Sequence, residues 1–432
     1  MKRINKATAT DVALEAPPSK AHTLRAIFLG ALADVRSAIR RPLLGADQRH
    51  AIECVRRLGA EVALEDDHLI VDGVGGRPRP QAEELNVGES GVTMNFVTAI
   101  ACLSGDPVLV TGAQGVLDRP IGELVSGLRQ LGCRVDYVGR EGFPPVRIHG
   151  GGIPGGAAEI RGQVTSQYFS AILAAAPYAA APVQLRCRGL LTERPYLTIT
   201  AAMMADFGVV LEAQPGRLFL VPNTRGYAGR EVAVEGDYSS AALFFEAAAV
   251  CGIRVTVTGL NPASVQGDRL FLTLLERMGC HVAALDRGFS ILGSELLPVE
   301  ADMVDTPDLV PPLAVTAAFA RGTSRLTGVA HLRHKESDRL AAIVSELGKM
   351  GVSASCDGGC LTVAGGGRPH GASIDPHNDH RIAMSFAVAG LAVGEQAIQD
   401  EACVAKSFPD FWSRLERFGQ AGRAQGESKG AG

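Results

Sequence analysis

Basic side chains gather at the points where turns lead into apolar helical stretches. Seven such cations stand there together with two acids: Lys20, Arg25, Arg119, Lys335, Arg339, Arg381 and Lys406, with Asp308 and Glu336. The first turn of a helix exposes unpaired N–H groups and carries partial positive charge, so it binds anions, and nearby lysine or arginine side chains strengthen that binding. The pattern predicts a site for a small ligand that carries several negative charges.

Hydroxyl and amide groups occur at the same kind of position. Thr165, Ser166 and Gln167 precede an apolar stretch, and Gly88 and Gly91 bracket another helix start. Glycine lets a backbone N–H approach a ligand closely, and hydroxyl or amide groups can hydrogen-bond phosphate or sugar oxygens. A second interpretation is that these groups only cap helices. Each segment taken singly leaves both interpretations open.

Sequence patterns typical of several other functions are absent. The chain has no Gly-x-x-x-x-Gly-Lys-Ser/Thr for nucleotide phosphates, no Gly-x-Ser-x-Gly and no His-Glu-x-x-His. His331 with His334, and His377 with His380, have a spacing that metal ligands can show, but neither pair has a third ligand nearby. The sequence therefore predicts no metal site.

Length and composition limit the class of protein. The chain has 432 residues, which is too long for one hydrophobic core and suits two domains of about 200 residues each. A net charge of −4 argues against a nucleic-acid or anionic-membrane partner. Nine cysteines without a Cys-x-x-Cys pair indicate free thiols in a reducing cytoplasm. Because no run of 18 residues is apolar throughout, no membrane-spanning helix is expected.

A helix–glycine–strand pattern recurs six times along the chain. Its marker glycines lie 68 to 76 residues apart, at positions 59, 132, 208, 279, 351 and 419, and only the sixth has no strand after it. Glycine after the last apolar turn is typical of a helix C-terminus, and a β-branched run after it predicts a strand. General α/β packing is the alternative explanation, but five similar spacings in a row favour a repeat of small α/β units.

Three units in each half predict two similar domains. We place the first domain at residues 17–234 and the second at 235–420, with residues 1–16 crossing over to join the second. The segment 421–432 is small and polar, and it is predicted to be a disordered tail. The polar residues described above would then lie at helix starts in both domains.

Eight short motifs, in order, resemble those of the enolpyruvyl transferases, most closely the EPSP synthases, over residues 17–418. They are Ser-Lys at 19–20, Gly-Glu-Ser-Gly at 88–91, Asp-Arg-Pro-Ile at 118–121, Thr-Ser-Gln at 165–167, Val-Glu-Gly-Asp-Tyr-Ser-Ser at 234–240, Lys-Glu-Ser-Asp-Arg at 335–339, Asn-Asp-His-Arg at 378–381 and Lys-Ser-Phe-Pro-Asp at 406–410. The resemblance implies an α/β (α+β) protein, a two-domain inside-out α/β barrel with three βαβαββ units in each domain. It also implies that the domains close on the substrates.

The same resemblance implies a reaction. The enolpyruvyl group of phosphoenolpyruvate would move to an acceptor hydroxyl, phosphate would be released, and no metal or organic cofactor would be required. Carried over motif by motif, the groups for the donor phosphate are Lys20, the Gly91 backbone, Arg119 and Gln167, those for its carboxylate are Arg339 and Arg381, and Lys406 completes the set.

Catalytic candidates also follow from the resemblance. Asp308 suits the base that takes the acceptor proton, and Lys20 and Glu336 suit proton transfer at the methylene carbon of the donor. His380 joins this catalytic set through the motif at 378–381. The expected partners are two small-molecule substrates, with no nucleic acid and no membrane, and a cytoplasmic monomer is expected.

The acceptor side departs from the family pattern. The implied acceptor-binding residues are Arg25, Thr165, Ser166, Gln167, Glu193, Tyr196, Asp308, His331 and Lys335. Ala21 and Glu193 stand where the family has serines, the second of which binds the acceptor phosphate. A shift of one residue would bring Thr192 into that position instead. Asn95 replaces an arginine and His331 an asparagine.

These replacements would weaken the binding of a phosphorylated acceptor, because hydroxyl contacts are lost and a carboxylate would lie beside the phosphate. We therefore expect a non-phosphorylated hydroxy-carboxylic acid as acceptor, with 3-hydroxybenzoate as one example. The alternative is shikimate 3-phosphate, the acceptor of 3-phosphoshikimate 1-carboxyvinyltransferases. A catalytically idle relative that only binds an anion would not need both Asp308 and Glu336. Gln114 stands where cell-wall enolpyruvyl transferases carry a reactive cysteine, which argues against their acceptor.

Overall fold

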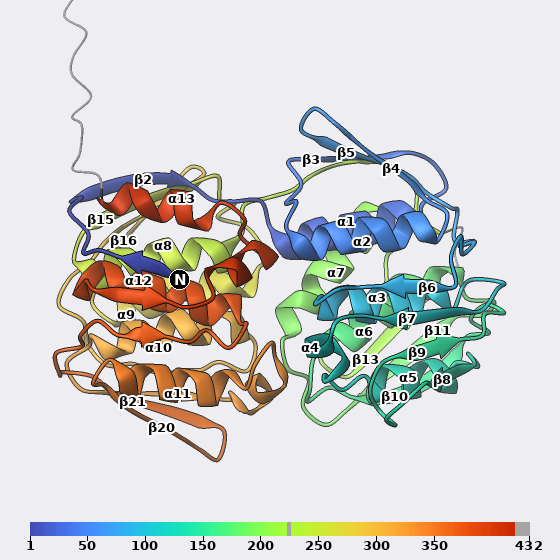
Figure 1. The fold of residues 1–432 in the computed structure, drawn as a ribbon. Helices are drawn as coiled ribbons and strands as arrows, with labels where there is room; N and C mark the ends of the chain where they lie inside the picture. The colour runs from blue at the N-terminus through green and yellow to red at the C-terminus, as the bar shows by residue number, and fades with distance from the viewer. Residues whose placement is uncertain (223–225, 420–432) are drawn as a thin grey trace, which may run out of the picture.

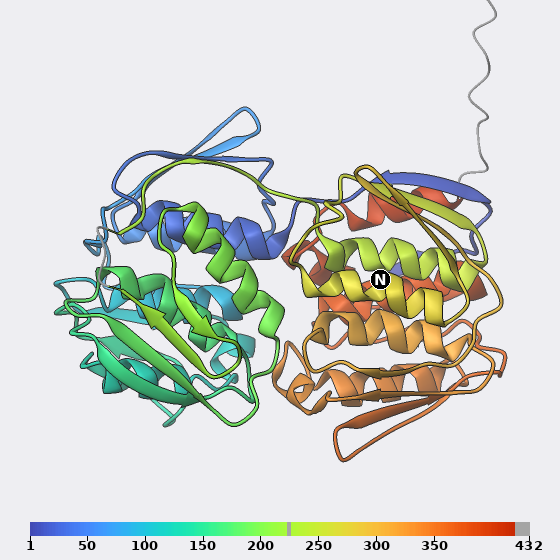
Figure 2. The same cartoon turned by 180° about the vertical axis from the view of Figure 1, so that it is seen from behind.

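Two lobes lie side by side in the computed structural model, which describes residues 1–222 and 226–419 (Figures 1 and 2). One hydrophobic core draws its buried residues from positions 24–234, and the other draws them from 4–16 together with 238–418. The domain boundaries at 17–234 and at 1–16 with 235–420 stay a prediction, which these two separate cores support. The predicted disorder of the tail 421–432 concerns residues outside the described part of the chain.

The N-terminal lobe contains three four-stranded sheets and the helices that they cover. Its strands are β3 (Ser37–Arg40), β4 (Glu61–Glu65), β5 (His68–Asp72) and β14 (Glu231–Ala233); β6 (Glu84–Asn86), β7 (Val108–Thr111), β8 (Val135–Tyr137) and β9 (Val146–Ile148); and β10 (Gly156–Arg161), β11 (Val183–Arg188), β12 (Glu212–Gln214) and β13 (Leu218–Val221). Its helices are α1 (Lys20–Leu32), α2 (Ala46–Arg57), α3 (Gly91–Ala101), α4 (Gln114–Leu117), α5 (Gly122–Gln130), α6 (Gln167–Ala175), η1 (Ala176–Tyr178) and α7 (Arg194–Asp206).

The C-terminal lobe repeats this plan with two four-stranded sheets and one three-stranded sheet. Its strands are β2 (Asp11–Glu15), β15 (Arg254–Thr258), β16 (His281–Leu285) and β17 (Gly288–Leu292); β18 (Glu300–Asp302), β19 (Thr323–Thr327), β20 (Ser353–Asp357) and β21 (Cys360–Ala364); and β1 (Lys2–Ile4), β22 (Ser373–Ile374) and β23 (Gln396–Ile398). Its helices are α8 (Tyr238–Cys251), η2 (Gly267–Arg269), α9 (Leu270–Arg277), η3 (Pro307–Leu309), α10 (Val310–Ala318), η4 (Ala330–His334), α11 (Arg339–Lys349), α12 (His380–Val393), η5 (Glu401–Lys406), α13 (Phe411–Leu415) and η6 (Glu416–Gly419).

Strand pairing defines the repeated unit. The first two strands of a unit are parallel, as Leu85 of β6 opposite Val110 of β7 shows, and a hairpin of two further strands then adds in antiparallel fashion to give the order β6-β7-β9-β8. In two units the first strand comes from a distant part of the sequence: β14 pairs with β3, and β2 pairs with β15. The chain therefore passes between the lobes twice. The α/β fold class predicted from the sequence is confirmed.

Helices form the interior of each lobe and sheets form its outer layer (Figure 1). All nine residues of α10 are buried, and α8 and α12 each bury twelve of fourteen residues. A helix that is apolar on all sides is stable only when it is surrounded, whereas α2, α9 and α11 are amphipathic and each has a polar face. This inside-out arrangement leaves the helix ends, rather than the sheet edges, to face the other lobe.

The marker glycines confirm the predicted repeat. Five of them, at positions 59, 132, 208, 279 and 351, follow the last turn of α2, α5, α7, α9 and α11 with φ between +78° and +101°. This left-handed conformation favours glycine and ends the helix. The sixth marker, Gly419, closes η6 instead of an α-helix.

Glu246 is a buried acid in the middle of α8. Its side chain is fully buried, and neither carboxylate oxygen has a hydrogen-bond partner among the described residues. Burial raises the pKa of Glu246 well above its ordinary value, so the folded protein keeps a proton that the unfolded chain loses above about pH 4.5. The unfolded state then binds fewer protons than the folded state, and stability falls as pH rises above that value.

We therefore expect Glu246→Gln to raise the free energy of unfolding at pH 8 by about 1–3 kcal/mol and to change it little at pH 4. Urea unfolding at both pH values measures the effect. Glu276→Gln, on the exposed face of α9, is the control and should leave the pH dependence unchanged. Equal stability of the Glu246→Gln variant and the wild type at pH 8 would contradict the account.

Candidate active site

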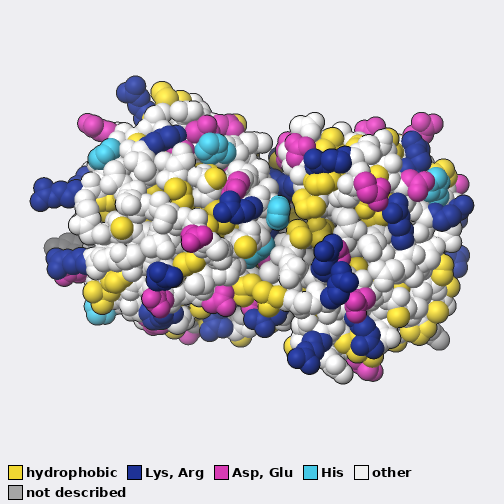
Figure 3. Space-filling view, turned by 90° about the horizontal axis from the view of Figure 1, so that it is seen from below, with side chains coloured by type: hydrophobic (Ala, Val, Ile, Leu, Met, Phe, Trp, Pro, Cys, Tyr) yellow, Lys and Arg dark blue, Asp and Glu magenta, His cyan; other side chains and the backbone are white. Residues whose placement is uncertain are grey.

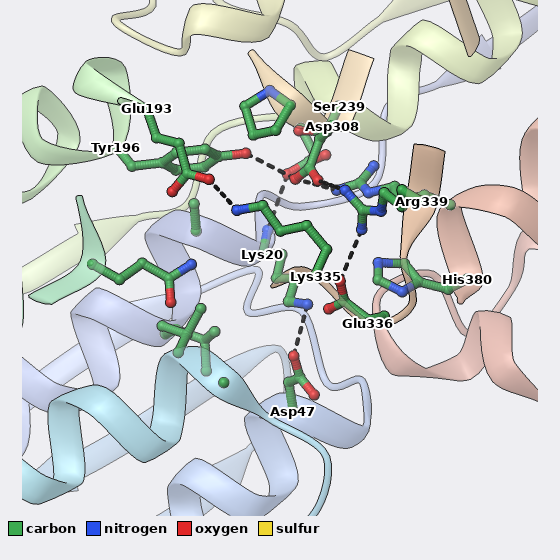
Figure 4. Close-up of a pocket in the computed structure, with 18 of the residues that line it drawn as sticks. Lys20, Asp47, Glu193, Tyr196, Ser239, Asp308, Lys335, Glu336, Arg339 and His380 are labelled. Carbon is green, nitrogen blue, oxygen red and sulfur yellow. Dashed lines mark hydrogen bonds and ion pairs between the residues drawn. The ribbon is translucent and has the colours of Figure 1, made fainter. Parts of the chain in front are cut away.

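A pocket lies where the two lobes meet, along the furrow between them (Figure 3). Its volume, including the space in its open mouth, is about 770 Å3. The lining residues come from both lobes: Lys20, Ala21, Leu24, Arg25, Asp47, Gly91, Val92, Arg119, Gln167, Glu193, Tyr196, Asp237, Ser239, Pro307, Asp308, Lys335, Glu336, Arg339, His380 and Arg381. Most of the charged side chains in Figure 4 project from the first turns of helices or from the turns just before them.

Helix capping places several of these side chains. Ser19 caps α1 by accepting a hydrogen bond from the backbone N–H of His22, which makes Lys20 the first helical residue, as predicted. Asp379 caps α12 by accepting from the backbone N–H of Arg381 at 2.9 Å. Helices α1, α3, α6 and α7 of one lobe and α8, α11 and α12 of the other direct their N-terminal ends at the pocket, and these ends favour anions.

Arg339 lies at the centre of the charge network. Its side chain is 1% exposed, and its guanidinium contacts three carboxylates: Asp379 at 2.8 Å, Asp308 at 2.8 Å and Glu336 at 2.9 Å. Burial disfavours the charged guanidinium, but the three carboxylates outweigh burial and raise the pKa of Arg339. Contacts on several sides fix the orientation of the planar group.

Asp308 is held as a carboxylate by neighbouring groups from both lobes. It accepts hydrogen bonds from Arg339 at 2.8 Å, from Arg381 at 3.1 Å and from the hydroxyl of Tyr196 at 2.8 Å. Burial works to raise the pKa of Asp308, but the positive charges of Arg381, Arg339 and Lys335 outweigh it and hold the pKa far below the ordinary value. A carboxylate that is stabilised this strongly is a weak base for as long as the arginines remain paired with it.

Glu336 is surrounded by cations in a similar way. Its carboxylate lies 2.9 Å from Arg339, 3.2 Å from Lys406 and 3.5 Å from Arg119. Burial opposes ionisation, yet these charges keep the pKa of Glu336 well below its ordinary value. Lys406 also donates to the backbone oxygen of Glu89 in the other lobe at 3.0 Å, so this cluster connects the lobes.

Lys20 pairs with an acid that the sequence analysis did not single out. Its ammonium group lies 2.7 Å from Asp47, whose side chain is 3% exposed (Figure 4). Asp47 stands in the first turn of α2, where an acidic residue is favoured by the helix dipole. Nothing in the sequence therefore indicates that Asp47 belongs to the pocket, because only the packing of α1 against α2 brings it close to Lys20.

Two arginine side chains retain unused hydrogen-bond donors. The Nε and one terminal nitrogen of Arg381 and the Nε of Arg119 are buried and lack a hydrogen-bond partner among the described residues. Buried donors without partners are costly unless a ligand completes them. Both side chains line the pocket. This observation indicates that an acceptor-rich, anionic ligand belongs there.

His380 is buried beside these charges. Burial and the neighbouring Lys20 lower the pKa of His380 well below its ordinary value, so the imidazole is neutral at pH 7. Its Nδ1 lies 3.9 Å from Asp379 and makes no hydrogen bond within the described residues. A neutral imidazole adds hydrogen-bonding capacity to the pocket without adding positive charge.

The predicted acceptor residues form a second cluster around Glu193. Its carboxylate forms an ion pair with Lys335 (Figure 4). It also accepts a hydrogen bond from Thr165 at 2.5 Å, and His331 lies 3.8 Å away. Ser166 donates to the backbone oxygen of Glu193 at 2.9 Å. Thr192 instead donates to the backbone oxygen of Gly162 in the structure, so Glu193 rather than Thr192 is the residue that reaches this cluster.

The guanidinium of Arg25 is hydrogen-bonded to neutral groups. It donates to Thr200 at 2.7 Å and to the backbone oxygens of Ala21 and Tyr196 at 3.0 Å each. Burial lowers the pKa of Arg25 to about 10, which still leaves it charged at neutral pH. The pocket wall therefore includes a cation that has no counter-ion among the residues that the structure describes.

Most of the residues predicted from the sequence line this pocket. Four lie just outside the wall: Thr165 lines the adjoining smaller pocket, Ser166 and His331 lie behind Glu193, and Lys406 lies behind Glu336. Lys406 ends η5, and the motif at 406–410 leads into the last helix, α13, which begins at Phe411 as expected. Pro409 disfavours a helical conformation at Phe408, so the helix begins only after the motif.

Asp47, Asp237, Ser239 and Asp379 belong to the charge network or the pocket wall and were not predicted as site residues. Asp379 lies inside the motif at 378–381, and Asp237 and Ser239 lie inside the motif at 234–240. The motifs at 378–381 and 234–240 could therefore have identified these three residues as candidates for the site. Among the described residues no group of three His, Cys, Asp or Glu side chains could hold a metal ion.

No helix in the described part of the chain is both long enough and apolar enough to cross a membrane.

The network predicts that Asp379 is required for stability. Asp379→Ala should lower the free energy of unfolding by about 3 kcal/mol or more, because it leaves the buried Arg339 without one of its three carboxylates and removes the cap of α12. Urea unfolding measures the loss. The matched control is Asp72→Ala, which breaks the exposed pair with Arg36 and should cost less than about 1 kcal/mol. Equal losses in the two variants would contradict the central place of Arg339.

Comparisons with known proteins agree with this geometry. A family model described as EPSP synthase (3-phosphoshikimate 1-carboxyvinyltransferase) matches residues 4–415. The 3-phosphoshikimate 1-carboxyvinyltransferase of Methanoculleus marisnigri is 45% identical over 416 residues, which cover 96% of this chain and 98% of the relative. That of Photobacterium profundum is 38% identical over 408 residues, covering 94% and 95%.

Solved structures agree on the fold. An EPSP synthase structure from Acinetobacter baumannii superposes with a TM-score of 0.79 at 26% identity and covers 96% of this chain and 97% of its own. The two-domain inside-out α/β fold predicted from the resemblance is thereby confirmed. The family match spans both lobes and every cation of the pocket. The chain therefore belongs to the EPSP synthase (3-phosphoshikimate 1-carboxyvinyltransferase) family and is a transferase of the carboxyvinyltransferase type.

Proposed function

We propose that this protein transfers the carboxyvinyl group of phosphoenolpyruvate to a hydroxyl of shikimate 3-phosphate and releases phosphate. The observation that carries the proposal is a set of buried arginine donors that lack partners among the described residues. They lie in a pocket shared by both lobes, in a chain whose relatives are named for this reaction. The reaction belongs to the shikimate pathway of aromatic biosynthesis. The expectations of a cytoplasmic location and a monomeric state stay predictions.

The donor has two anionic groups, and the pocket offers two groups of cations for them. We assign its phosphate to Lys20 and Arg119, with the amide of Gln167 and the backbone N–H of Gly91 at helix starts. Lys406 completes the set from its place behind Glu336. The distance between Gly91 and Arg119 supports this assignment, since a Cβ on residue 91 would lie 2.9 Å from the guanidinium. We assign the donor carboxylate to Arg339 and Arg381, whose planar groups suit a carboxylate.

Donor binding would activate the base. In the structure Asp308 is paired with Arg339 and Arg381, the two arginines to which we assign the donor carboxylate. When the donor carboxylate replaces it, Asp308 loses the charges that lower its pKa and becomes a better proton acceptor. The acceptor hydroxyl then gives its proton to Asp308 while its oxygen bonds to C2 of the donor. Tyr196, which donates to Asp308 at 2.8 Å, would keep the carboxylate aimed into the pocket.

The second half of the reaction concerns the methylene carbon. C3 of the donor must gain a proton as the acceptor adds and lose one as phosphate leaves, which restores a double bond in the product. Lys20 and Glu336 flank the donor site and suit these two transfers. His380 is neutral and buried beside Glu336, so its proposed part is to hydrogen-bond the donor or Glu336 (Figure 4).

A second candidate acceptor is a hydroxy-carboxylic acid without a phosphate, such as 3-hydroxybenzoate, which the sequence analysis favoured. The names of the relatives give that acceptor no support. One observation still favours it: Lys335, a cation that could hold the acceptor phosphate, is already paired with Glu193. Shikimate 3-phosphate is the proposal that the comparisons support better.

Phosphate release identifies the acceptor. Incubation with phosphoenolpyruvate and shikimate 3-phosphate should release inorganic phosphate, because that acceptor presents a hydroxyl to Asp308 in a donor-loaded pocket. 3-Hydroxybenzoate should support little or no release. Phosphate release with 3-hydroxybenzoate but not with shikimate 3-phosphate would establish the second candidate. No phosphate release with either acceptor would contradict the proposed reaction.

The role of Asp308 can be tested by substitution. Asp308→Asn should lower kcat by about 100- to 10,000-fold, because a general base contributes about that much to a rate. Asp305→Asn is the control: it lies three residues earlier, forms an exposed pair with Arg194, and should keep kcat within about threefold of the wild type. A kcat for Asp308→Asn that matches the control would remove Asp308 from the mechanism.

A further inference from the structure

Glu193 places a negative charge of the protein itself at the acceptor end of the pocket. The side chain is 1% exposed and comes from the residue just before α7. Its carboxylate forms an ion pair with Lys335 from the other lobe, and it accepts a hydrogen bond from Thr165 at 2.5 Å. Both carboxylate oxygens are therefore engaged by groups that also suit an anionic ligand.

The surroundings of this carboxylate form an anion-binding site. We call Thr165, His331 and Lys335 the anion cradle. The Nε2 of His331 is buried, lies 3.8 Å from the Glu193 carboxylate and has no hydrogen-bond partner among the described residues. Because burial lowers the pKa of His331 to about 4, the ring is neutral at pH 7, and the cradle carries only the single positive charge of Lys335. One charge in the cradle balances one anion.

The backbone holds Glu193 in this position. Glu193 has φ +58° and ψ 34°, a left-handed conformation that is uncommon for a residue with a side chain. Its N–H donates to the backbone oxygen of Val304 in the other lobe at 3.0 Å, and its own oxygen accepts from Ser166. The neighbouring interactions therefore determine where the carboxylate points.

The cradle is the part of the pocket left for the acceptor's anion. The proposed donor site uses Lys20 and Arg119 for one anionic group, and Arg339 and Arg381 for the other. Among the remaining cations that line the pocket, Arg25 is committed to three neutral partners. Lys335 remains, and Glu193 neutralises it.

We propose that Glu193 is an internal anion that limits the affinity for a phosphorylated acceptor, which binds only by displacing the Glu193 carboxylate from Lys335. This inference takes the identity of the acceptor from the proposed function. Two anions cannot share one buried ammonium without strong repulsion, so the phosphate competes with the carboxylate for the cradle. An acceptor without a phosphate leaves the Glu193–Lys335 pair intact.

Equilibrium binding tests the inference without catalysis. Dissociation constants for shikimate 3-phosphate and for shikimate are measured by titration calorimetry in the absence of phosphoenolpyruvate. The preference for the phosphorylated ligand is the dissociation constant for shikimate divided by that for shikimate 3-phosphate. Glu193→Ser should raise this ratio by at least about tenfold, because one like charge leaves the site. Glu193→Gln keeps the shape, removes the charge and should shift the ratio in the same direction.

Asp305→Asn is the matched control. It breaks the nearby Arg194–Asp305 pair, which also joins the lobes but lies outside the cradle, and it should leave the ratio within about threefold of the wild type. An unchanged or lower ratio in both Glu193 variants would overturn the inference. Failure of the proposed function is a separate result, because it would appear as no phosphate release with either acceptor while the binding ratio still responds to Glu193.

Discussion

Most of the positive charge buried in the cleft is balanced by the protein's own carboxylates, and the rest of the site depends on this balance. Burial penalises an unpaired charge heavily, so a pocket lined by arginine and lysine is stabilised by anions of its own. Asp308 and Glu336 supply them at Arg339, Asp47 supplies one at Lys20, and Glu193 supplies one at Lys335. Each of these pairings is an interaction that an anionic substrate would have to replace or share.

The fold provides the geometry that this balance needs. With the sheets on the outside and apolar helices inside, each lobe turns helix N-terminal ends toward the other lobe (Figures 1 and 4). Partners for the charges come from across the cleft: Lys335 reaches Glu193, Tyr196 reaches Asp308, and Lys406 reaches the backbone of Glu89. Separating the lobes would break all three contacts, whereas the pairs of Arg339 with Asp308 and Glu336 lie within one lobe.

Local rules were enough to predict the repeat and the positions of most cations. A glycine at a helix end and a polar residue at a helix start can be recognised in the sequence, as Gly59 and Ser19 respectively show. Residues that only tertiary packing brings together cannot be recognised as partners in this way. Asp47 looks like an ordinary first-turn acid until α1 packs beside α2. The replacement at Glu193 was visible in the sequence, but its pairing with Lys335 depends on how the lobes meet, and it therefore required the structure.

The central claim is that the anionic groups of the donor take over the cations now held by the protein's own carboxylates. A crystal structure of the protein with phosphoenolpyruvate bound and no acceptor tests it most directly. The account predicts that the donor carboxylate lies on Arg339 and Arg381, with Asp308 released from both guanidinium groups and facing the empty acceptor space. A donor bound elsewhere, or an Asp308 that keeps both arginine contacts beside a bound donor, would contradict it.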